Sequence, residues 1–120
     1  MALIKKFEEI MAWQEARKMV QAVYQITEMG AFSKDFGLRD QIRRAAVSVM
    51  TNIAEGFDNE SKTEFARFLG YSRRSAVETQ SLLYTAMDVH YIDQLVFDAI
   101  YQQADKTKAL IGGLKKSLQK

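Results

Sequence analysis

Residues 38–56 read Leu-Arg-Asp-Gln-Ile-Arg-Arg-Ala-Ala-Val-Ser-Val-Met-Thr-Asn-Ile-Ala-Glu-Gly, and this stretch decides the fold. At about 100° per residue, its apolar side chains gather on one face, which is typical of a helix packed on a core. A polar seam borders that face, and apolar side chains also occur on the far side, where a surface helix is usually polar. We therefore expect a bundle helix that also meets a partner. The core face comprises Leu38, Ile42, Ala45, Val49, Ile53 and Gly56, the polar seam Gln41, Ser48, Asn52 and Glu55, and the far side Arg43, Val47 and Met50.

The same helical period recurs in three other segments of the chain. Four amphipathic helices joined by short connections favour an up-down-up-down arrangement. No internal repeat, linker or low-complexity tract divides the sequence. The sequence therefore predicts an all-α fold, an antiparallel up-down-up-down four-helix bundle, in a single domain over residues 1–120. The expected helices span residues 13–28, 38–56, 62–88 and 93–118.

Particular residues suggest how these helices begin and end. Phe32 and Phe36 lie between the first two helices, where we expect them to close the end of the core. Gly56 is suited to the left-handed conformation that often ends a helix. Ser61 and Glu64 have the spacing of a capping box, in which the serine oxygen binds the third amide and the glutamate binds the first. This pair predicts the start of the third helix.

The composition of the chain excludes several kinds of site and several classes of protein. Hydrophobic residues make up 48% of the 120 positions, and the formal net charge is only +2. The chain contains no cysteine, which excludes disulfides, thiolate metal sites and a cysteine nucleophile. No segment approaches the roughly 20 apolar residues that span a bilayer, and the start lacks the apolar run of a signal peptide. We expect a cytoplasmic protein with no membrane partner.

The sequence offers little for catalysis. His90 is the only histidine, and no cluster has the spacing of a metal site. Within the polar seam, Asn52 and Glu55 could bind a ligand or polarise a water molecule. They could equally form hydrogen bonds to a neighbouring helix or subunit and fix its register. We favour this structural interpretation, and we expect no enzyme activity, no metal and no cofactor.

Arginines are the candidates for nucleic-acid binding, because clustered guanidinium groups can follow phosphates. Adjacent helical residues point about 100° apart, so neither arginine pair forms a patch alone. Surface ion pairs are the competing explanation, since Arg67 follows Glu64 by three residues and Arg74 precedes Glu78 by four. The candidate nucleic-acid-binding residues are Arg43, Arg44, Arg67, Arg73 and Arg74.

Three runs of residues, 36–38, 41–49 and 52–56, together resemble the signature of a known family. Its members are four-helix bundles encoded within intervening sequences of bacterial 23S ribosomal RNA genes, sometimes labelled as a ribosomal protein. The resemblance extends over nearly the whole chain. It implies an antiparallel bundle that assembles into a closed ring, typically a homopentamer, with no assigned molecular function. A related bundle is the accessory protein of diversity-generating retroelements, which implies contact with a reverse transcriptase and nucleic acid.

These observations lead to one functional hypothesis and one alternative. The hypothesis is a non-enzymatic oligomeric helical module that binds structured RNA or a nucleoprotein. Val47 and Met50 would then face a neighbouring subunit of the ring, and repetition of a modest arginine patch would strengthen its field. The alternative is a protein-binding scaffold or accessory subunit, for example of a reverse transcriptase, with no direct role in nucleic-acid binding.

Overall fold

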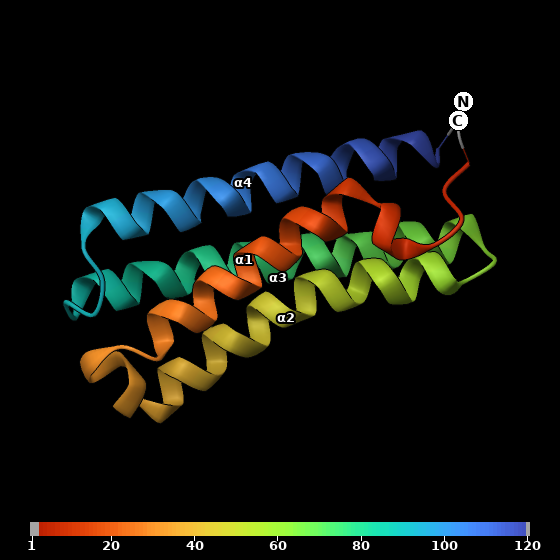
Figure 1. Ribbon diagram of the computed structural model, residues 1–120. Helices are drawn as coiled ribbons and strands as arrows, with labels where there is room; N and C mark the ends of the chain where they lie inside the picture. The colour runs from red at the N-terminus through yellow and green to blue at the C-terminus, as the bar shows by residue number, and fades with distance from the viewer. Residues whose placement is uncertain (1–2, 120) are drawn as a thin grey trace.

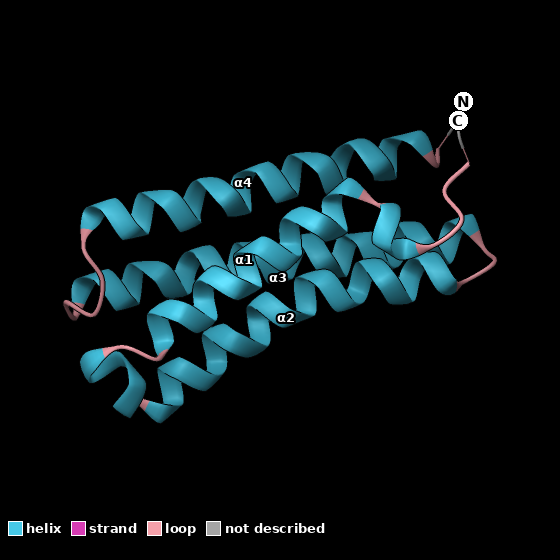
Figure 2. Cartoon of the chain, viewed as in Figure 1, coloured by secondary structure: helices cyan, strands magenta, loops and turns pink. Residues whose placement is uncertain are grey.

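The computed structural model describes residues 3–119, and all regular structure in that range is helical (Figures 1 and 2). Long helices that follow one another in sequence pack together, and the first of them also packs against the last, which closes the bundle. Residues 3–6 and the end of the last helix lie at the same end of the molecule (Figure 1). The predicted antiparallel up-down-up-down bundle is confirmed. The elements are η1 (Phe7–Glu9), α1 (Met11–Thr27), η2 (Gly30–Lys34), α2 (Phe36–Asp58), α3 (Lys62–Asp88) and α4 (Gln94–Ser117).

The helix boundaries differ from the predicted ones by at most two residues. α1 begins at Met11, two residues earlier than predicted. The residue before it, Ile10, forms no side-chain cap, so the sequence contains no capping signal that would mark this start. α2 also begins early, because the Asp35 carboxylate accepts a hydrogen bond from the Leu38 amide at 3.1 Å. An aspartate in this position caps orphan amides of the first turn.

Gly56 does not end α2, so the predicted left-handed cap is wrong. The helix continues to Asp58, and Gly56 is buried inside it. A Cβ atom at this position would lie 2.6 Å from Cβ of Phe68 and 3.0 Å from Cδ1 of Phe65. Glycine is therefore required here by the close approach of α3, and not by its backbone conformation.

Among the predictions for the ends of the bundle, those for Phe32 and Ser61 are confirmed, and those for Phe36 and the Glu64 side chain are wrong. Phe32 is 1% exposed and stacks on Tyr91 at 5.0 Å, so it closes the core as expected. Phe36 is 62% exposed, and its predicted place in the core is wrong.

Ser61 caps α3 by accepting a hydrogen bond from the Glu64 amide at 3.2 Å. The return bond from the Glu64 side chain is not formed, because that carboxylate pairs with Arg67 at 2.7 Å.

The turn after α3 is built around His90, which has a φ of 66°. The His90 amide donates to the Met87 carbonyl at 3.0 Å, and the Tyr91 amide donates to the Ala86 carbonyl at 2.8 Å. These two bonds form a Schellman motif, which satisfies carbonyls at a helix end. The exposed His90 therefore has a capping role.

The faces predicted to be buried are confirmed for most of their residues. A single cluster of buried side chains runs through the bundle and includes Ile42, Val49 and Ile53 from α2. Leu38 is only half-buried, and Ala46 is buried although the predicted face omits it. The buried arc of α2 is wider than one stripe, because α2 packs against both α1 and α3.

Candidate nucleic-acid interface

The polar seam of α2 lies along its boundary with α3. Ser75 donates a hydrogen bond to the Ser48 hydroxyl at 3.0 Å, and so connects the two helices. The Asn52 amide group donates to the Ser48 carbonyl at 2.8 Å and to its hydroxyl at 2.9 Å. Gln41 and Glu55 are exposed. The seam thus contains an interhelical hydrogen-bond network at its centre, with solvent-facing groups at its ends.

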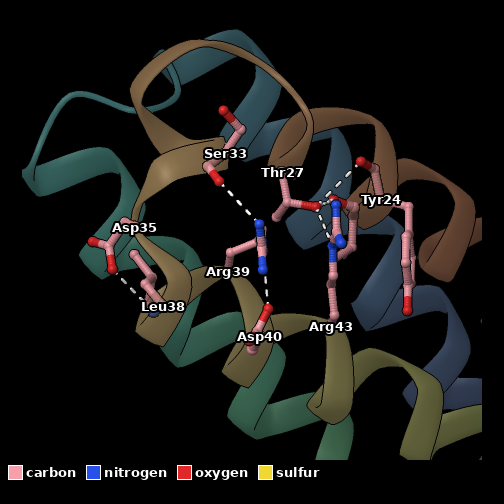
Figure 3. Close-up of polar contacts among 9 residues, drawn as sticks. Tyr24, Thr27, Ser33, Asp35, Leu38, Arg39, Asp40 and Arg43 are labelled. Atoms are coloured by element: carbon pink, nitrogen blue, oxygen red, sulfur yellow. Dashed lines mark hydrogen bonds and ion pairs between the residues drawn. The ribbon is translucent and has the colours of Figure 1, made fainter.

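Arg43 is held between α2 and α1 and does not lie on the far side of α2 as expected. Its Nε donates to Oγ1 of Thr27 at 2.7 Å, and its guanidinium lies 4.4 Å from the ring centroid of Tyr24 (Figure 3). Met50 is likewise half-buried and packs against the core. Both residues belong to the flank of α2 that meets α1. Of the apolar residues expected on the far side, Val47 alone lines the outer surface.

The first turns of α2 carry a second arginine contact. Arg39 donates to the Ser33 carbonyl at 3.0 Å and to the Asp40 carboxylate at 2.9 Å (Figure 3). The hydrogen bond from Arg39, with smaller contributions from the charges of Arg44 and Arg43, lowers the pKa of Asp40. Asp40 is therefore ionised at neutral pH and offsets part of the local positive charge.

The outer surface of α2 is hollowed by two adjoining shallow depressions. One, of about 550 Å³, extends toward α1, and the other, of about 450 Å³, extends toward α3. Arg44 and Ser48 line both depressions and therefore connect them. Arg44 is exposed and forms no ion pair within residues 3–119. The first depression is lined by Tyr24, Asp40, Arg43, Arg44, Val47, Ser48 and Thr51, and the second by Gln41, Arg44, Ala45, Ser48, Ser75 and Glu78.

Two arginines of α3 flank one tyrosine. The guanidinium carbons of Arg67 and Arg74 each lie 5.9 Å from the ring centroid of Tyr71. The expected ion pair between Arg67 and Glu64 is present, at 2.7 Å. The expected pair between Arg74 and Glu78 is not formed, and Arg74 lies over Tyr71 instead.

The structure brings three of the five candidate arginines to one outer surface. Arg43, which is held against Thr27 of α1, and Arg73 are the exceptions. Residues 67, 71, 74 and 78 follow the spacing of one helical stripe. Glu78, at one end of this stripe, shares a depression with Arg44 of α2. Arg44, Arg67 and Arg74 therefore belong to one outer surface of α2 and α3, which we call the α2–α3 surface. Arg73 is exposed, but it points about 100° away from Arg74.

The sequence-based prediction missed two tyrosines that contact candidate arginines, Tyr24 of α1 and Tyr71 of α3. Tyr24 of α1 has the helical spacing of the buried Thr27, which favours a place in the core, yet it is 38% exposed against Arg43. Tyr71 was not assigned any role. Its spacing from Arg67 and Arg74, four residues before and three after, is the signal that could have found it, because such neighbours share a helix face.

Within residues 3–119, no group of three or more histidine, cysteine, aspartate or glutamate side chains could hold a metal ion. No helix in this part of the chain is both long and apolar enough to cross a membrane.

The fold and this surface define a class: an antiparallel four-helix bundle with an outward array of arginine and tyrosine side chains. The chain belongs to the family of 23S rRNA-intervening sequence proteins, whose pattern it matches over residues 8–113. Its structure is similar to the crystal structure of a protein of unknown function from the S23 ribosomal protein family of Bacteroides thetaiotaomicron. The TM-score is 0.79, and the match covers 88% of this chain and 95% of that one at 22% identity. Comparison with curated proteins finds no match.

Proposed function

We propose that this protein is a non-catalytic helical module that binds structured RNA, alone or within a nucleoprotein, through its α2–α3 surface. The observation that supports this proposal is the presence on one surface of Arg44 and Arg74, both exposed and neither engaged in an ion pair within residues 3–119. Unpaired guanidinium groups bind phosphate oxygens readily, because no internal partner has to be displaced. The family's connection with 23S rRNA makes ribosomal RNA the first ligand to test.

The chemistry around these arginines suits a phosphate backbone better than a protein carboxylate. Arg44 lies beside the hydroxyl groups of Ser48 and Thr51. The Ser48 hydroxyl accepts from Asn52 and Ser75 and retains its proton for a phosphate oxygen. The Thr51 hydroxyl donates to the Val47 carbonyl at 3.1 Å and can still accept from a ribose 2′-hydroxyl. The acidic groups nearby are partly engaged, since Asp40 binds Arg39 and Glu64 binds Arg67. The α2–α3 surface therefore presents free donors along a shallow, open hollow of the kind that can follow a nucleic-acid strand.

The test is an RNA titration in a salt series. The probes are a structured 23S rRNA fragment and an unrelated RNA of equal length. The double variant Arg44→Gln/Arg74→Gln is expected to weaken binding roughly tenfold at 0.1 M salt and to reduce the salt slope by about 2. The matched control, Arg17→Gln/Lys34→Gln, removes the same charge from exposed positions elsewhere and should keep the slope. Equal slopes in both variants, or no RNA binding at low salt, would overturn the proposal.

We include self-association in the proposed function. Val47 is half-buried at the outer surface of α2, where it lines the larger depression. Val47 lines only the depression toward α1, so a second copy that covers it on that side would bury this apolar group and leave the α3 part of the α2–α3 surface exposed. Repetition of that part around an assembly would multiply the avidity for an extended RNA. Light scattering at micromolar concentration should give a mass several times that of one chain, and Val47→Glu should lower it. A monomeric wild-type protein would refute this part of the proposal.

The alternative function, a protein-binding scaffold, is favoured by a different surface. Tyr84 is 49% exposed between α3 and α4 and packs edge-on against Phe97 at 4.7 Å and Tyr101 at 6.0 Å. Exposed aromatic side chains of this kind are enriched in protein interfaces. If no RNA binds at low salt, this surface becomes the first candidate for partner binding.

A further inference from the structure

We infer that Tyr71, with Arg67 and Arg74, binds unpaired bases of the RNA, so that the ligand is a loop, bulge or single strand and not a continuous duplex. This inference rests on the proposed RNA binding and specifies its ligand. Its basis is the arrangement of one aromatic ring between two guanidinium groups on the outer side of α3.

The ring of Tyr71 is fixed but not covered. Phe68 packs against it edge to face, with centroids 5.8 Å apart and an interplanar angle of 77°. The two guanidinium carbons, each 5.9 Å from the centroid, are at the outer limit of a cation–π contact. Neither guanidinium therefore lies flat on the ring, where atoms would approach to about 3.5–4 Å. A planar group can stack on the ring or on either guanidinium with little rearrangement.

The polar groups around Tyr71 match a nucleotide. The Tyr71 hydroxyl forms no hydrogen bond within residues 3–119, and Tyr71 is 37% exposed. Arg74 has no ion-pair partner in the same range, whereas Arg67 retains Glu64. One aromatic plane, one free cation and one free hydroxyl can bind the base, the phosphate and the sugar or base edge of a single nucleotide.

This combination distinguishes unpaired from paired RNA. In an A-form duplex the faces of the bases are stacked on one another, so only phosphates, 2′-hydroxyls and base edges are accessible. A duplex would use the arginines but gain nothing from an exposed tyrosine ring. Unpaired bases stack on such rings irrespective of their identity, since each base has a π-face. The chemical class of ligand is therefore single-stranded RNA, with weak sequence preference.

The experiment compares a hairpin that has a single-stranded loop with a fully paired duplex of the same length. Tyr71→Leu removes the ring, Tyr71→Phe retains it, and Tyr84→Leu serves as the control for an exposed tyrosine elsewhere on α3. Circular dichroism melting checks that each variant is folded. Tyr71→Leu is expected to weaken hairpin binding about tenfold and leave duplex binding unchanged. Tyr71→Phe keeps the ring and loses only the hydroxyl, so it should weaken hairpin binding by about twofold to threefold. A 2-aminopurine base in the loop should be quenched on binding by wild type and not by Tyr71→Leu.

The outcomes separate this inference from the proposed function. If Tyr71→Leu weakens hairpin and duplex binding equally, or weakens neither, while Arg44→Gln/Arg74→Gln still lowers the salt slope, then RNA binding holds and recognition of unpaired bases is refuted. If wild type binds neither RNA at low salt, both are refuted. Loop-selective loss in Tyr71→Leu, with the quenching signal lost as well, supports both.

Discussion

Replacing Gly56 with alanine is expected to lower the free energy of unfolding by about 2 kcal/mol, although alanine is the better helix former. The added Cβ would lie 2.6 Å from Cβ of Phe68, an atom that is fixed to the α3 backbone and cannot rotate away. The contact can be relieved only if α2 and α3 move apart. This displacement would strain the neighbouring interhelical hydrogen bond from Ser72 to the Val49 carbonyl, which is 2.6 Å long.

Gly112 of α4 supplies a matched control for this prediction. A Cβ atom added there meets nothing within 4 Å, so Gly112→Ala gains helix propensity without a contact. It should raise the free energy of unfolding by up to about 1 kcal/mol. Urea unfolding of both variants measures the two changes. The same chemical substitution should thus act with opposite sign in α2 and α4, and a Gly56→Ala variant as stable as wild type would show that α3 does not approach α2 this closely.

The fold could be predicted because the spacing of apolar residues within each helix shows which face of that helix is buried. In α3, Leu69, Ala76 and Leu83 recur at helical spacing, and all are 0% exposed. A repeat of this kind depends only on local geometry, since the side of a helix that faces the core is fixed by about 3.6 residues per turn. Short connections then leave few ways to arrange four helices.

The sequence could not show which side chains meet across helices. Arg43 and Thr27 are separated by 16 residues, whereas Gln103 and the Glu15 carbonyl, 3.0 Å apart, are separated by 88. Periodicity places a residue on a face, but it does not specify which neighbouring helix lies on the left or right of that face. For this reason Arg43 and Met50 were expected on the far side of α2, although both lie toward its neighbours.

The candidate interface was predicted in part for the same reason. The arginines were identifiable as a residue type, and the stripe from Arg67 to Arg74 follows from spacing within one helix. The position of Arg44 beside Glu78 depends on the register between α2 and α3. That register is set by contacts such as Ser75 with Ser48, which no pattern within a single helix encodes.

A cluster around Glu15, also absent from the sequence-based prediction, joins α1 to α4. The residue is 6% exposed. Its carboxylate pairs with Lys18 at 2.8 Å and with Lys106 at 2.9 Å, and it accepts a hydrogen bond from Gln103 at 3.2 Å. The hydrogen bond from Lys18, followed by that from Lys106, lowers the pKa of Glu15 from 4.5 to about 2, against the opposing effect of burial.

The pH dependence of stability follows from the direction of this shift. A carboxyl group whose pKa is lower in the folded protein stabilises the fold when it is ionised. Its contribution is therefore complete above pH 4.5 and is lost as the pH falls toward about 2. The lysine side chains are 64% and 61% exposed, so solvent screening reduces the contribution well below the value that the shift alone would give.

Glu15→Gln is accordingly expected to lower the free energy of unfolding by about 1 to 2 kcal/mol at pH 7. The difference from wild type should shrink below pH 4.5 and become small near pH 2, because about half of the wild-type carboxyl groups are then protonated in the folded protein. Urea unfolding at a series of pH values measures it. Glu60→Gln removes the same charge from an exposed glutamate and should show no comparable loss. A Glu15→Gln difference that stays constant across the pH range would mean that packing, and not the paired charge, holds α1 against α4.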